Sequence, residues 1–336
     1  MKATFDGNLH FTIFGESHGE AIGVTIEGLP VGFQPDMAAL GAFLARRAPG
    51  NSPLSSSRKE ADSVEFISGL FEGRFCGGPV TALIRNTDAH SSDYAAIRHT
   101  PRPGHADYTA QLKYRGYQDY RGGGSFSGRM TAPLCMVGGL CLQLLAQKGI
   151  AVTARIVEIG GCTEDLEQRM AEAKAQHDSV GGIIEVCATG VPGGLGGPLF
   201  EGLEGRIAQT VFAIPAVKGI EFGSGFGGAR LMGSENNDAF RMENGQVVTA
   251  TNHSGGILGG ISDGMPLTFR VAVKPTPSIG KAQQTVDIIS EEDTELTVAG
   301  RHDPCIVPRA LPCMEAATAI VLYDALLERK KEDLWT

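Results

Sequence analysis

The sequence predicts an α+β fold in which helices pack on β-sheets as the layers of a sandwich. Segments rich in β-branched residues with a period of two alternate irregularly with segments of helical periodicity. Hydrophobic residues make up 42% and charged residues 20% of the 336 residues, as in folded proteins. The composition does not change along the chain, and the Gly/Pro-rich segment 190–198 has too few polar residues for a linker. We therefore expect residues 1–336 to form one domain.

Strands are predicted where short β-branched runs occur. They are expected at residues 11–14, 23–27, 80–84, 150–156, 183–187, 217–222 and 267–273. The segment VTIEGLPVG (24–32) resembles EVCATGVPGG (185–194), and both precede a candidate helix. This similarity predicts an internal duplication of a strand-turn-helix unit. The alternative is that the Gly-hydrophobic-Pro pattern marks two similar turns.

Helices are predicted from periodicity and from residues typical of helix ends. Asp36 suits the N-cap of the first helix, which stops before Pro49. The third is apolar all round and is closed by Gly149, as expected of a core helix. The fourth begins with acidic side chains, which favour the positive end of the helix dipole. The five helices are expected at residues 36–47, from about 105, at 128–148, from 163, and after Pro312 to residue 330.

The bulk composition excludes several classes of protein. A formal net charge of −9 argues against a nonspecific binder of nucleic acid or of membrane surfaces, because those partners select for basic faces. Seven cysteines without a C-x-x-C pair suggest neither a disulfide framework nor a zinc knuckle. The start of the chain does not resemble a signal peptide, and the longest apolar stretch, residues 132–146, is too short to span a bilayer. We expect a cytoplasmic protein without a membrane partner.

The sequence does not support either of two familiar nucleotide-binding motifs. Residues 223–228 satisfy G-x-G-x-x-G after a short strand, but the sequence that follows does not open the helix that a dinucleotide site needs. An unrelated NAD-dependent oxidoreductase is the hypothesis that this motif would support. No P-loop is present, and the histidines and carboxylates lack the short spacings of metal ligands, so no metal is expected.

Glycine is unusually frequent, with 46 residues, and several glycine-rich segments carry histidines. Such segments let the backbone approach a ligand, and histidine is the side chain best suited to proton transfer near neutral pH. A single histidine would more often be structural, but four in similar turns favour a functional site. The four are His18, His105, His253 and His302.

Arginines lie close to the same turns although the whole protein is acidic. This distribution predicts a cationic pocket, and because guanidinium groups bind phosphate and carboxylate with two hydrogen bonds, a small polyanion is the expected substrate class. The alternative is that each arginine pairs with a neighbouring carboxylate such as Glu16, Asp107 or Asp119. The arginines are Arg46, Arg47, Arg102, Arg121, Arg129 and Arg301.

From about residue 8 to residue 327 the sequence resembles chorismate synthase. The resemblance is carried, in the family's order, by FGESHG, SGLFEG, RPGHADYT, DYRGGG, GVPGGLG, AVKGIEFGSGF, NHSGGILGGISDGMP, KPTPSI and GRHDPC. It implies a chorismate synthase-like fold and a lyase that eliminates phosphate from 5-enolpyruvylshikimate 3-phosphate, using reduced FMN without net oxidation. It also implies a place in the shikimate pathway of aromatic amino acid biosynthesis.

The resemblance assigns roles to individual residues. It implies that His18 protonates the departing phosphate, that His105 protonates the reduced flavin, and that Asp303 assists removal of the substrate proton. The substrate-binding residues that it implies are Ser17, Arg46, Arg47, Arg121 and Arg129. The flavin-binding residues that it implies are Ser125, Phe126, Ser127, Pro215, Ala216, Gly259, Lys274, Pro275, Thr276, Pro277, Ser278 and Arg301.

This chain departs from the family pattern at a few positions. The family's Arg-Ser-Ser triplet is Ser125-Phe126-Ser127 here, and Met130, Ala48 and Pro53 stand where the family has charged residues. Loss of a charge-assisted contact costs about 1.5–3 kcal/mol, which would weaken binding without abolishing the reaction. The alternative function is a flavin- or anion-binding paralogue with lost or altered lyase activity. The resemblance further implies a homotetramer, and we expect an external, nicotinamide (NADP)-linked reductant for the flavin.

Overall fold

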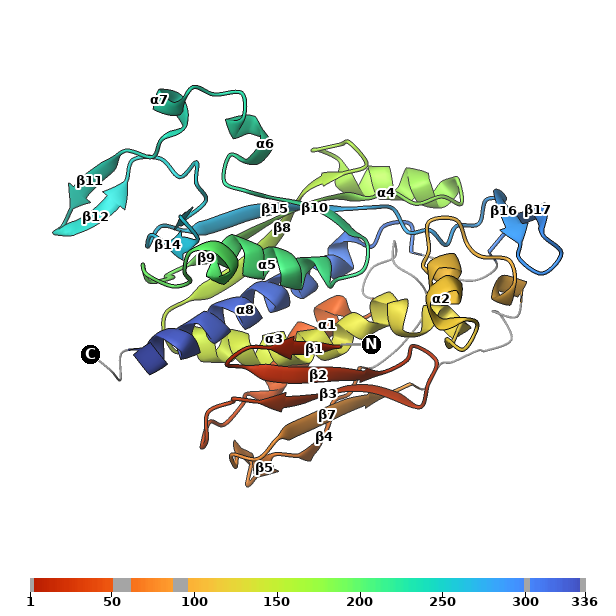
Figure 1. The fold of residues 1–336 in the computed structure, drawn as a ribbon, viewed down its shortest axis with the longest axis horizontal. Coiled ribbons are helices and arrows are strands. Elements are labelled where there is room, and N and C mark those ends of the chain that lie inside the picture. Colours follow the sequence, from red (N-terminus) through yellow and green to blue (C-terminus); the bar gives the residue numbers. More distant parts are fainter. Residues whose placement is uncertain (1–2, 51–61, 87–95, 299–302, 333–336) are drawn as a thin grey trace.

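Two antiparallel sheets enclose a layer of helices in the computed structural model, which describes residues 3–50, 62–86, 96–298 and 303–332 (Figure 1). The first sheet has the order β1-β2-β3-β7-β4 and the second the order β10-β15-β9-β8. The strands of the first sheet are β1 (Thr4–Asp6), β2 (His10–Gly15), β3 (Ala21–Glu27), β7 (Val80–Arg85) and β4 (Glu65–Ser68). Those of the second are β10 (Val217–Phe222), β15 (Leu267–Val273), β9 (Gly182–Thr189) and β8 (Ala151–Ile159).

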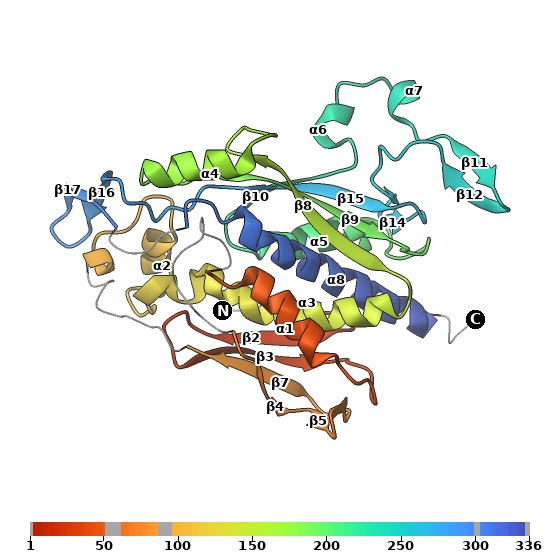
Figure 2. The same ribbon diagram turned by 180° about the vertical axis from the view of Figure 1, so that it is seen from behind.

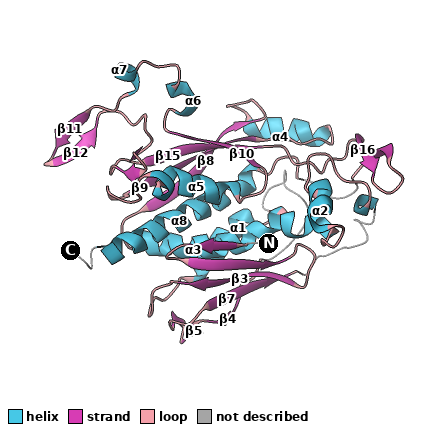
Figure 3. Ribbon diagram, viewed as in Figure 1, coloured by secondary structure: helices cyan, strands magenta, loops and turns pink. Residues whose placement is uncertain are grey.

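The helices of the inner layer form the core between the sheets, as the secondary-structure colouring makes plain (Figure 3). They are α1 (Met37–Arg47), α3 (Thr131–Ala146), α5 (Leu203–Phe212) and α8 (Val307–Glu332). The closest packing is between α3 and α8, because a Cβ atom added at Gly138 would lie 2.2 Å from the Cβ atom of Ala316. Buried side chains of both sheets and of these helices join in one continuous hydrophobic cluster.

The remaining elements lie outside this sandwich. Seen from behind, α4 (Leu166–Ala175) covers the outer side of the second sheet (Figure 2). The other helices are η2 (Ala96–Arg98), α2 (Asp107–Tyr114), η3 (Arg121–Phe126), η4 (Gly128–Met130), η5 (Leu199–Glu201), α6 (Gly225–Gly228) and α7 (Gly233–Asn236). The short strands form the hairpins β5 (Leu70–Phe71) with β6 (Arg74–Phe75), β11 (Phe240–Glu243) with β12 (Gln246–Thr249), β13 (Ile257–Leu258) with β14 (Ile261–Ser262), and β16 (Gln283–Asp287) with β17 (Glu292–Leu296).

Local sequence signals predicted most of these elements correctly. Each predicted strand is present, and the prediction for β15 has the observed ends. Asp36 caps α1 as expected, since its carboxylate accepts a 2.9 Å hydrogen bond from the backbone N–H of Ala39. The predicted layered α+β fold is therefore confirmed.

Two helix predictions were wrong or incomplete. The last helix does not begin after Pro312 but at Val307, so that Pro312 lies inside α8. Its buried packing against α3 compensates for the backbone hydrogen bond that a proline cannot make. The sequence analysis also missed α5, whose residues Leu203, Ile207 and Val211 form a buried stripe at helical spacing.

Within the part of the chain that the structure describes, two apolar helices are long enough to cross a membrane, but both are core helices by burial. They span residues 128–146 and 307–331, and 78% and 83% of their most apolar windows are buried inside the protein. The first corresponds to the predicted core helix. All seven cysteines lie at described positions and are free thiols; the sulfur atoms of Cys135 and Cys313 are 3.8 Å apart between α3 and α8.

Both segments of the predicted duplication are strand-turn-helix units. β3 leads through a turn to α1, and β9 leads through a longer turn to α5. Gly28 and Gly190 begin these turns with φ values of +90° and +74°, and a Cβ atom at either would clash with a backbone carbonyl oxygen. Similar turns would produce the same pattern, so the duplication stays a prediction, as does the single domain.

Candidate active site

His18 and His105 lie against the glycine turn at Gly122 and Gly123, where added side chains would collide with the imidazole rings. A Cβ atom at Gly122 would be 2.1 Å from Cε1 and Nδ1 of His18, and one at Gly123 would be 3.0 Å from Cε1 of His105. Both glycines have positive φ values, +58° and +90°. Ser17 belongs to the same group, because its hydroxyl is 3.1 Å from Nδ1 of His18. The DYRGGG segment therefore brings the two histidines together.

His105 is part of a buried ionic network with Asp107 and Arg102. Its Nδ1 is 2.6 Å from Oδ1 of Asp107, and the carboxylate accepts two further hydrogen bonds from the Arg102 guanidinium at 2.7 and 2.8 Å. Burial raises the pKa of the Asp107 carboxyl, but its hydrogen bonds with Arg102 and His105 outweigh this effect and hold the pKa well below its usual range. Asp107 is thus an ionised acceptor at neutral pH.

The segment from Lys274 to Ser278 packs against the turn that precedes His105. The ammonium of Lys274 donates a hydrogen bond to the carbonyl oxygen of Gly104, and Nη1 of Arg102 donates to the hydroxyl of Ser278 at 3.1 Å. Burial, together with the charge of Lys218, lowers the pKa of Lys274. Five predicted flavin contacts, including Pro275, Thr276 and Pro277, therefore lie in the segment beside His105.

Ala216 and Asp303 border the same segment. The backbone N–H of Lys274 donates to the carbonyl oxygen of Ala216 at 2.9 Å, and the hydroxyl of Thr276 donates to the carbonyl oxygen of Asp303 at 3.2 Å. Pro215 precedes Ala216 and is exposed. The structure therefore connects the predicted catalytic aspartate to the predicted flavin segment.

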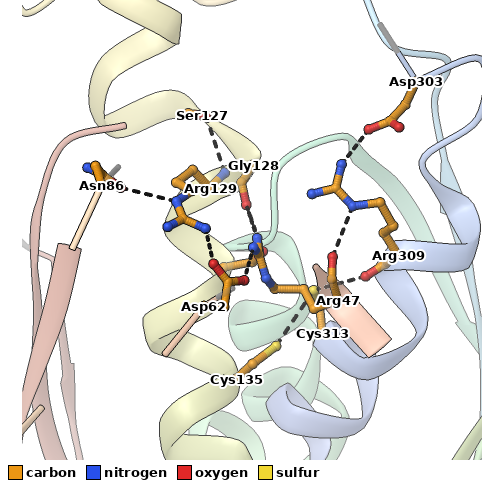
Figure 4. A network of polar contacts seen from close by, with 11 residues as sticks. Arg47, Asp62, Asn86, Ser127, Gly128, Arg129, Cys135, Asp303, Arg309 and Cys313 are labelled. Atoms are coloured by element: carbon orange, nitrogen blue, oxygen red, sulfur yellow. Dashed lines mark hydrogen bonds and ion pairs between the residues drawn. The ribbon is translucent and has the colours of Figure 1, made fainter. Parts of the chain in front are cut away.

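Asp303 forms an ion pair with Arg309, which lies in the first turn of α8 (Figure 4). The Nε of Arg309 also donates to the backbone carbonyl oxygen of Arg47 at 2.9 Å. Arg309 thus ties the aspartate to the end of α1. The sequence analysis did not identify Arg309, although its position six residues after Asp303 was available as a signal.

Arg47 and Arg129 share one buried carboxylate, that of Asp62 (Figure 4). Nη2 of Arg47 donates to one oxygen at 2.5 Å, and Nη1 of Arg129 donates to the other. Burial raises the pKa of Asp62, but the two guanidinium groups outweigh this and hold the pKa below its usual range. Asp62 was missed because nothing in the local sequence links it to either arginine.

The other two arginines predicted to bind substrate are paired with carboxylates. Arg46 forms two hydrogen bonds with Glu315, at 2.7 and 2.9 Å, and Arg121 forms two with Asp119, at 2.7 and 2.8 Å. Both guanidinium groups remain partly exposed, with 47% and 40% of the side-chain surface accessible. Their roles in substrate binding stay predictions, and the expected pairing of Arg121 with Asp119 is present.

The substituted triplet continues from the glycine turn toward Arg129. Ser127 accepts a 3.2 Å hydrogen bond from the backbone N–H of Arg129 and so caps η4. Phe126 is 37% exposed, and its ring centroid is 6.3 Å from that of Tyr114. Ser125 lies between Phe126 and the glycines. The aromatic ring thus packs toward α2.

Some of the predicted site residues do not lie near the glycine turn and its two histidines within one chain. Gly259 lies between β13 and β14, and both ribbon views place β14 at the opposite end of the second sheet from α2 (Figures 1 and 2). His253 contacts the carbonyl oxygen of Asn236 at 3.0 Å, away from the glycine turn. Arg301, His302 and Pro53 lie outside the described residues.

The structure also bears on the nucleotide motif and on the metal prediction. Residues 223–228 follow β10, but the helix that they open, α6, has only four residues, which is too short for a dinucleotide-binding helix. Among the residues that the structure describes, His, Cys, Asp and Glu do not gather in groups of three that could hold a metal ion. The absence of a metal stays a prediction.

Comparisons with known proteins agree with one another over nearly the whole chain. The family model described as chorismate synthase matches residues 9–327. The chain is 50% identical to the chorismate synthase of Thermococcus gammatolerans, covering 96% of this chain and 97% of that protein. It is 45% identical to that of Methanosarcina mazei, with 96% and 95% covered. A crystal structure of a chorismate synthase superposes with a TM-score of 0.75 at 29% identity and covers 96% of this chain and 92% of its own.

The matches extend beyond short motifs, because they include both sheets, the helical layer and the loops that carry the two histidines. A family model over residues 9–327 and relatives of 45–50% identity over almost their full length agree with the structural match to a solved chorismate synthase. This chain belongs to the chorismate synthase family.

Proposed function

We propose that His18, His105 and Asp303 carry the proton transfers of this phosphate-eliminating lyase, which acts in the shikimate pathway of aromatic amino acid biosynthesis. The enzyme removes phosphate and a proton from 5-enolpyruvylshikimate 3-phosphate to form chorismate. The observation that best supports the assignment is the glycine turn, which holds both imidazoles against Gly122 and Gly123. Histidine transfers protons well near neutral pH, so two imidazoles at one turn suit a reaction with two proton transfers.

In this proposal each of the three residues has a separate role. His18 donates a proton to the departing phosphate, which lowers the charge of the leaving group. His105 protonates the bound cofactor, and Asp303 assists removal of the C6 proton of the substrate. The ion pair with Arg309 supports the role of Asp303, because it orients the carboxylate.

Reduced FMN fits the residues around His105. Gly104 has a φ of +74°. A Cβ atom there would meet Pro277 at 3.6 Å and the ammonium of Lys274 at 3.9 Å. Because glycine has no side chain, the backbone at this position is accessible to a ligand beside a cation. Lys274, Thr276 and Ser278 would hold the cofactor with their charge and hydroxyl groups. When bound, reduced FMN supplies an electron-rich ring and a basic nitrogen for the elimination.

The substrate carries carboxylate and phosphate groups, and positive charge at the site favours both. Arg47 and Arg129 both bring a buried guanidinium group to the carboxylate of Asp62. Two guanidinium groups at one place support an anionic substrate. Ser17, Arg46 and Arg121 complete the proposed substrate-binding set.

The proposed active protein is a homotetramer in the cytoplasm that receives electrons for its flavin from an external, NADP-linked reductant. The position of Gly259 supports an oligomer, because a second copy is needed to bring this residue to a flavin held near Lys274. The exposed hairpin β11–β12 supports it as well, since Phe240 and Met242 are 66% and 68% exposed.

An anaerobic assay tests the proposed function. Purified protein, photoreduced FMN and 5-enolpyruvylshikimate 3-phosphate are mixed, and phosphate release is measured together with chorismate absorbance. We expect both products, dependent on reduced FMN, and a loss of turnover in His18→Ala and in His105→Ala. Unchanged turnover in either variant would contradict the assigned roles. Flavin binding without either product would favour the altered paralogue and would implicate the Ser125-Phe126-Ser127 triplet.

A further inference from the structure

We propose that Asp107, held in place by Arg102, is the positioning residue that sets the tautomer and the orientation of His105. This inference rests on the proposed function, in which His105 is a proton donor. The contact on which it depends is the 2.6 Å approach of Asp107 Oδ1 to His105 Nδ1.

The direction of this hydrogen bond follows from the charge of Asp107. An ionised carboxylate can only accept, and the hydrogen bonds from Arg102 and His105 favour the ionised form over the effect of burial. His105 Nδ1 must therefore carry the proton and donate it. A length of 2.6 Å is typical of a charge-assisted bond.

Arg102 immobilises the carboxylate that orients the ring. Its Nε and Nη2 contact the two oxygens of Asp107 separately, and its backbone N–H donates to Oδ2 at 3.0 Å. The side chains of Arg102 and Asp107 are only 5% and 11% exposed. Because Asp107 is also the first residue of α2, the helix dipole favours its negative charge.

The other ring nitrogen of His105 lies at the glycine turn. A Cβ atom at Gly123 would be 3.1 Å from Nε2, so this edge of the ring faces the backbone of the turn. With Nδ1 bound to Asp107, Nε2 is the nitrogen that exchanges a proton with a ligand. The tautomer fixed by Asp107 thus decides which atom of His105 acts.

Arg102 also contacts the ring itself, because its Nη2 lies 3.0 Å from Nδ1 and 3.4 Å from Nε2 of His105. The same arginine donates to Ser278, so the group that holds His105 is joined to the proposed flavin segment.

The test begins with the ring nitrogens of His105 in protein without flavin. Protein labelled with ¹⁵N-histidine contains eight histidines, and the His105 signals are assigned by their loss in His105→Gln. We expect a protonated Nδ1 whose proton resonates far downfield, as in short hydrogen bonds. Asp107→Asn should remove this downfield signal, and Asp107→Glu, which keeps the carboxylate, should retain it. A signal that persists unchanged in Asp107→Asn would overturn the proposal.

The second part measures turnover under the anaerobic conditions. We expect Asp107→Asn to lower kcat about 10- to 100-fold, as is typical when the partner of a functional histidine is removed, with little change in the KM for substrate. Asp107→Glu should recover part of the loss. A change in KM alone, with kcat unchanged, would contradict a role in proton transfer.

Asp324→Asn is the matched control. Asp324 is a buried aspartate of α8 that pairs with Arg206 and accepts from the backbone N–H of Leu9, without a histidine. This variant should lower thermal stability but leave the His105 signal and kcat unchanged; an equal loss of kcat would overturn the proposal. The ring signal is read without substrate or flavin. Inactivity of the unchanged protein therefore counts against the proposed function. A His105 signal that is the same in Asp107→Asn as in the unchanged protein counts against the positioning role.

Discussion

At the scale of single residues, Gly122 and Gly123 are important because they have no side chains. Their backbones occupy the space beside the imidazoles of His18 and His105, in conformations with positive φ that side chains disfavour. A side chain at either position would collide with an imidazole even in the absence of a ligand. The glycines are thus as important to the site as the histidines that they contact.

We predict that Gly122→Ala lowers kcat at least about 100-fold, because it displaces the imidazole of His18 and so removes a general acid. The added Cβ atom would be 2.1 Å from the ring, and the left-handed backbone would cost about 1–3 kcal/mol of stability as well. Steady-state kinetics and thermal unfolding measure the two effects. Gly128→Ala is the control, since its Cβ atom would meet nothing within 4 Å. Equal activity of the two variants would contradict the prediction.

Asp62 makes a second prediction, which concerns stability and pH. Asp62→Asn should lower the free energy of unfolding at pH 7 by about 3–5 kcal/mol, because it removes the carboxylate that pairs with the two buried guanidinium groups of Arg47 and Arg129. The pKa of Asp62 is depressed in the folded state, so its contribution is present above the unfolded pKa of about 3.9 and is lost as the pH falls through the folded value.

Urea unfolding at several pH values checks this sign. The difference between Asp62→Asn and the unchanged protein should be full near neutral pH and should shrink in acid. Asp178→Asn is the comparison, because Asp178 pairs with Lys281 near the surface, where such bridges contribute about 0–1 kcal/mol. A difference that grew toward low pH would show that the sign is wrong.

At the scale of elements, the close contact of α3 with α8 sets the thickness of the helical layer. Gly138 allows the backbones to approach, since its Cβ atom would lie 2.2 Å from Cβ and 2.3 Å from Cα of Ala316. The sequence indicated that residues 128–148 form a buried helix but not which helix it meets. That partner, α8, carries Arg309, so the helix contact also places the residue that holds Asp303.

We therefore predict that Gly138→Ala destabilises the protein by about 1–3 kcal/mol, the typical cost of overpacking a core. Gly41→Ala should have the opposite effect and stabilise it by about 0.5–1 kcal/mol, because Gly41 lies in α1 with nothing within 4 Å of an added Cβ atom and alanine is the better helix former. Urea unfolding compares the two. Stabilisation by Gly138→Ala would contradict the close packing.

At the scale of the whole molecule, the site combines loops from both sheets. His18 follows β2 in the first sheet, whereas Lys274 follows β15 in the second. The turn before α2 and the glycine turn before α3 complete it, and all lie at the end of the sandwich where α2 and β16 are seen (Figure 1). The opposite end carries Gly259 and the projecting hairpin β11–β12.

We predict that the double change Phe240→Glu with Met242→Glu dissociates the proposed homotetramer. A two-stranded hairpin is marginally stable alone in water, and β11 has apolar side chains that are two-thirds exposed. Light scattering coupled to size-exclusion chromatography measures the mass. Arg241→Gln, on the same strand, changes charge without changing the apolar side chains and should keep the native mass. If the protein with both glutamate substitutions still has the mass of a tetramer, this hairpin is not a subunit contact.

The sequence alone determined the local structure and the family. Local runs located the strands of both sheets except β1 and β4, Asp36 located the start of α1, and the motifs around His18, His105 and Asp303 predicted the lyase. These signals are local, because they depend on neighbouring residues and their backbone conformations. α5 was missed although Leu203, Ile207 and Val211 have helical spacing, whereas the start of α8 was mispredicted because packing outweighs the proline signal there.

Only the tertiary structure decided which charged groups meet. Arg47, Asp62 and Arg129 come together from separate parts of the chain, and Arg309 reaches the backbone of Arg47 because α8 packs beside α1. No local pattern records such contacts, since long-range ion pairs form when packing brings distant side chains into a buried space where each charge needs a partner. The sequence thus predicts which residues carry the chemistry, and the packing of helices between two sheets determined their neighbours.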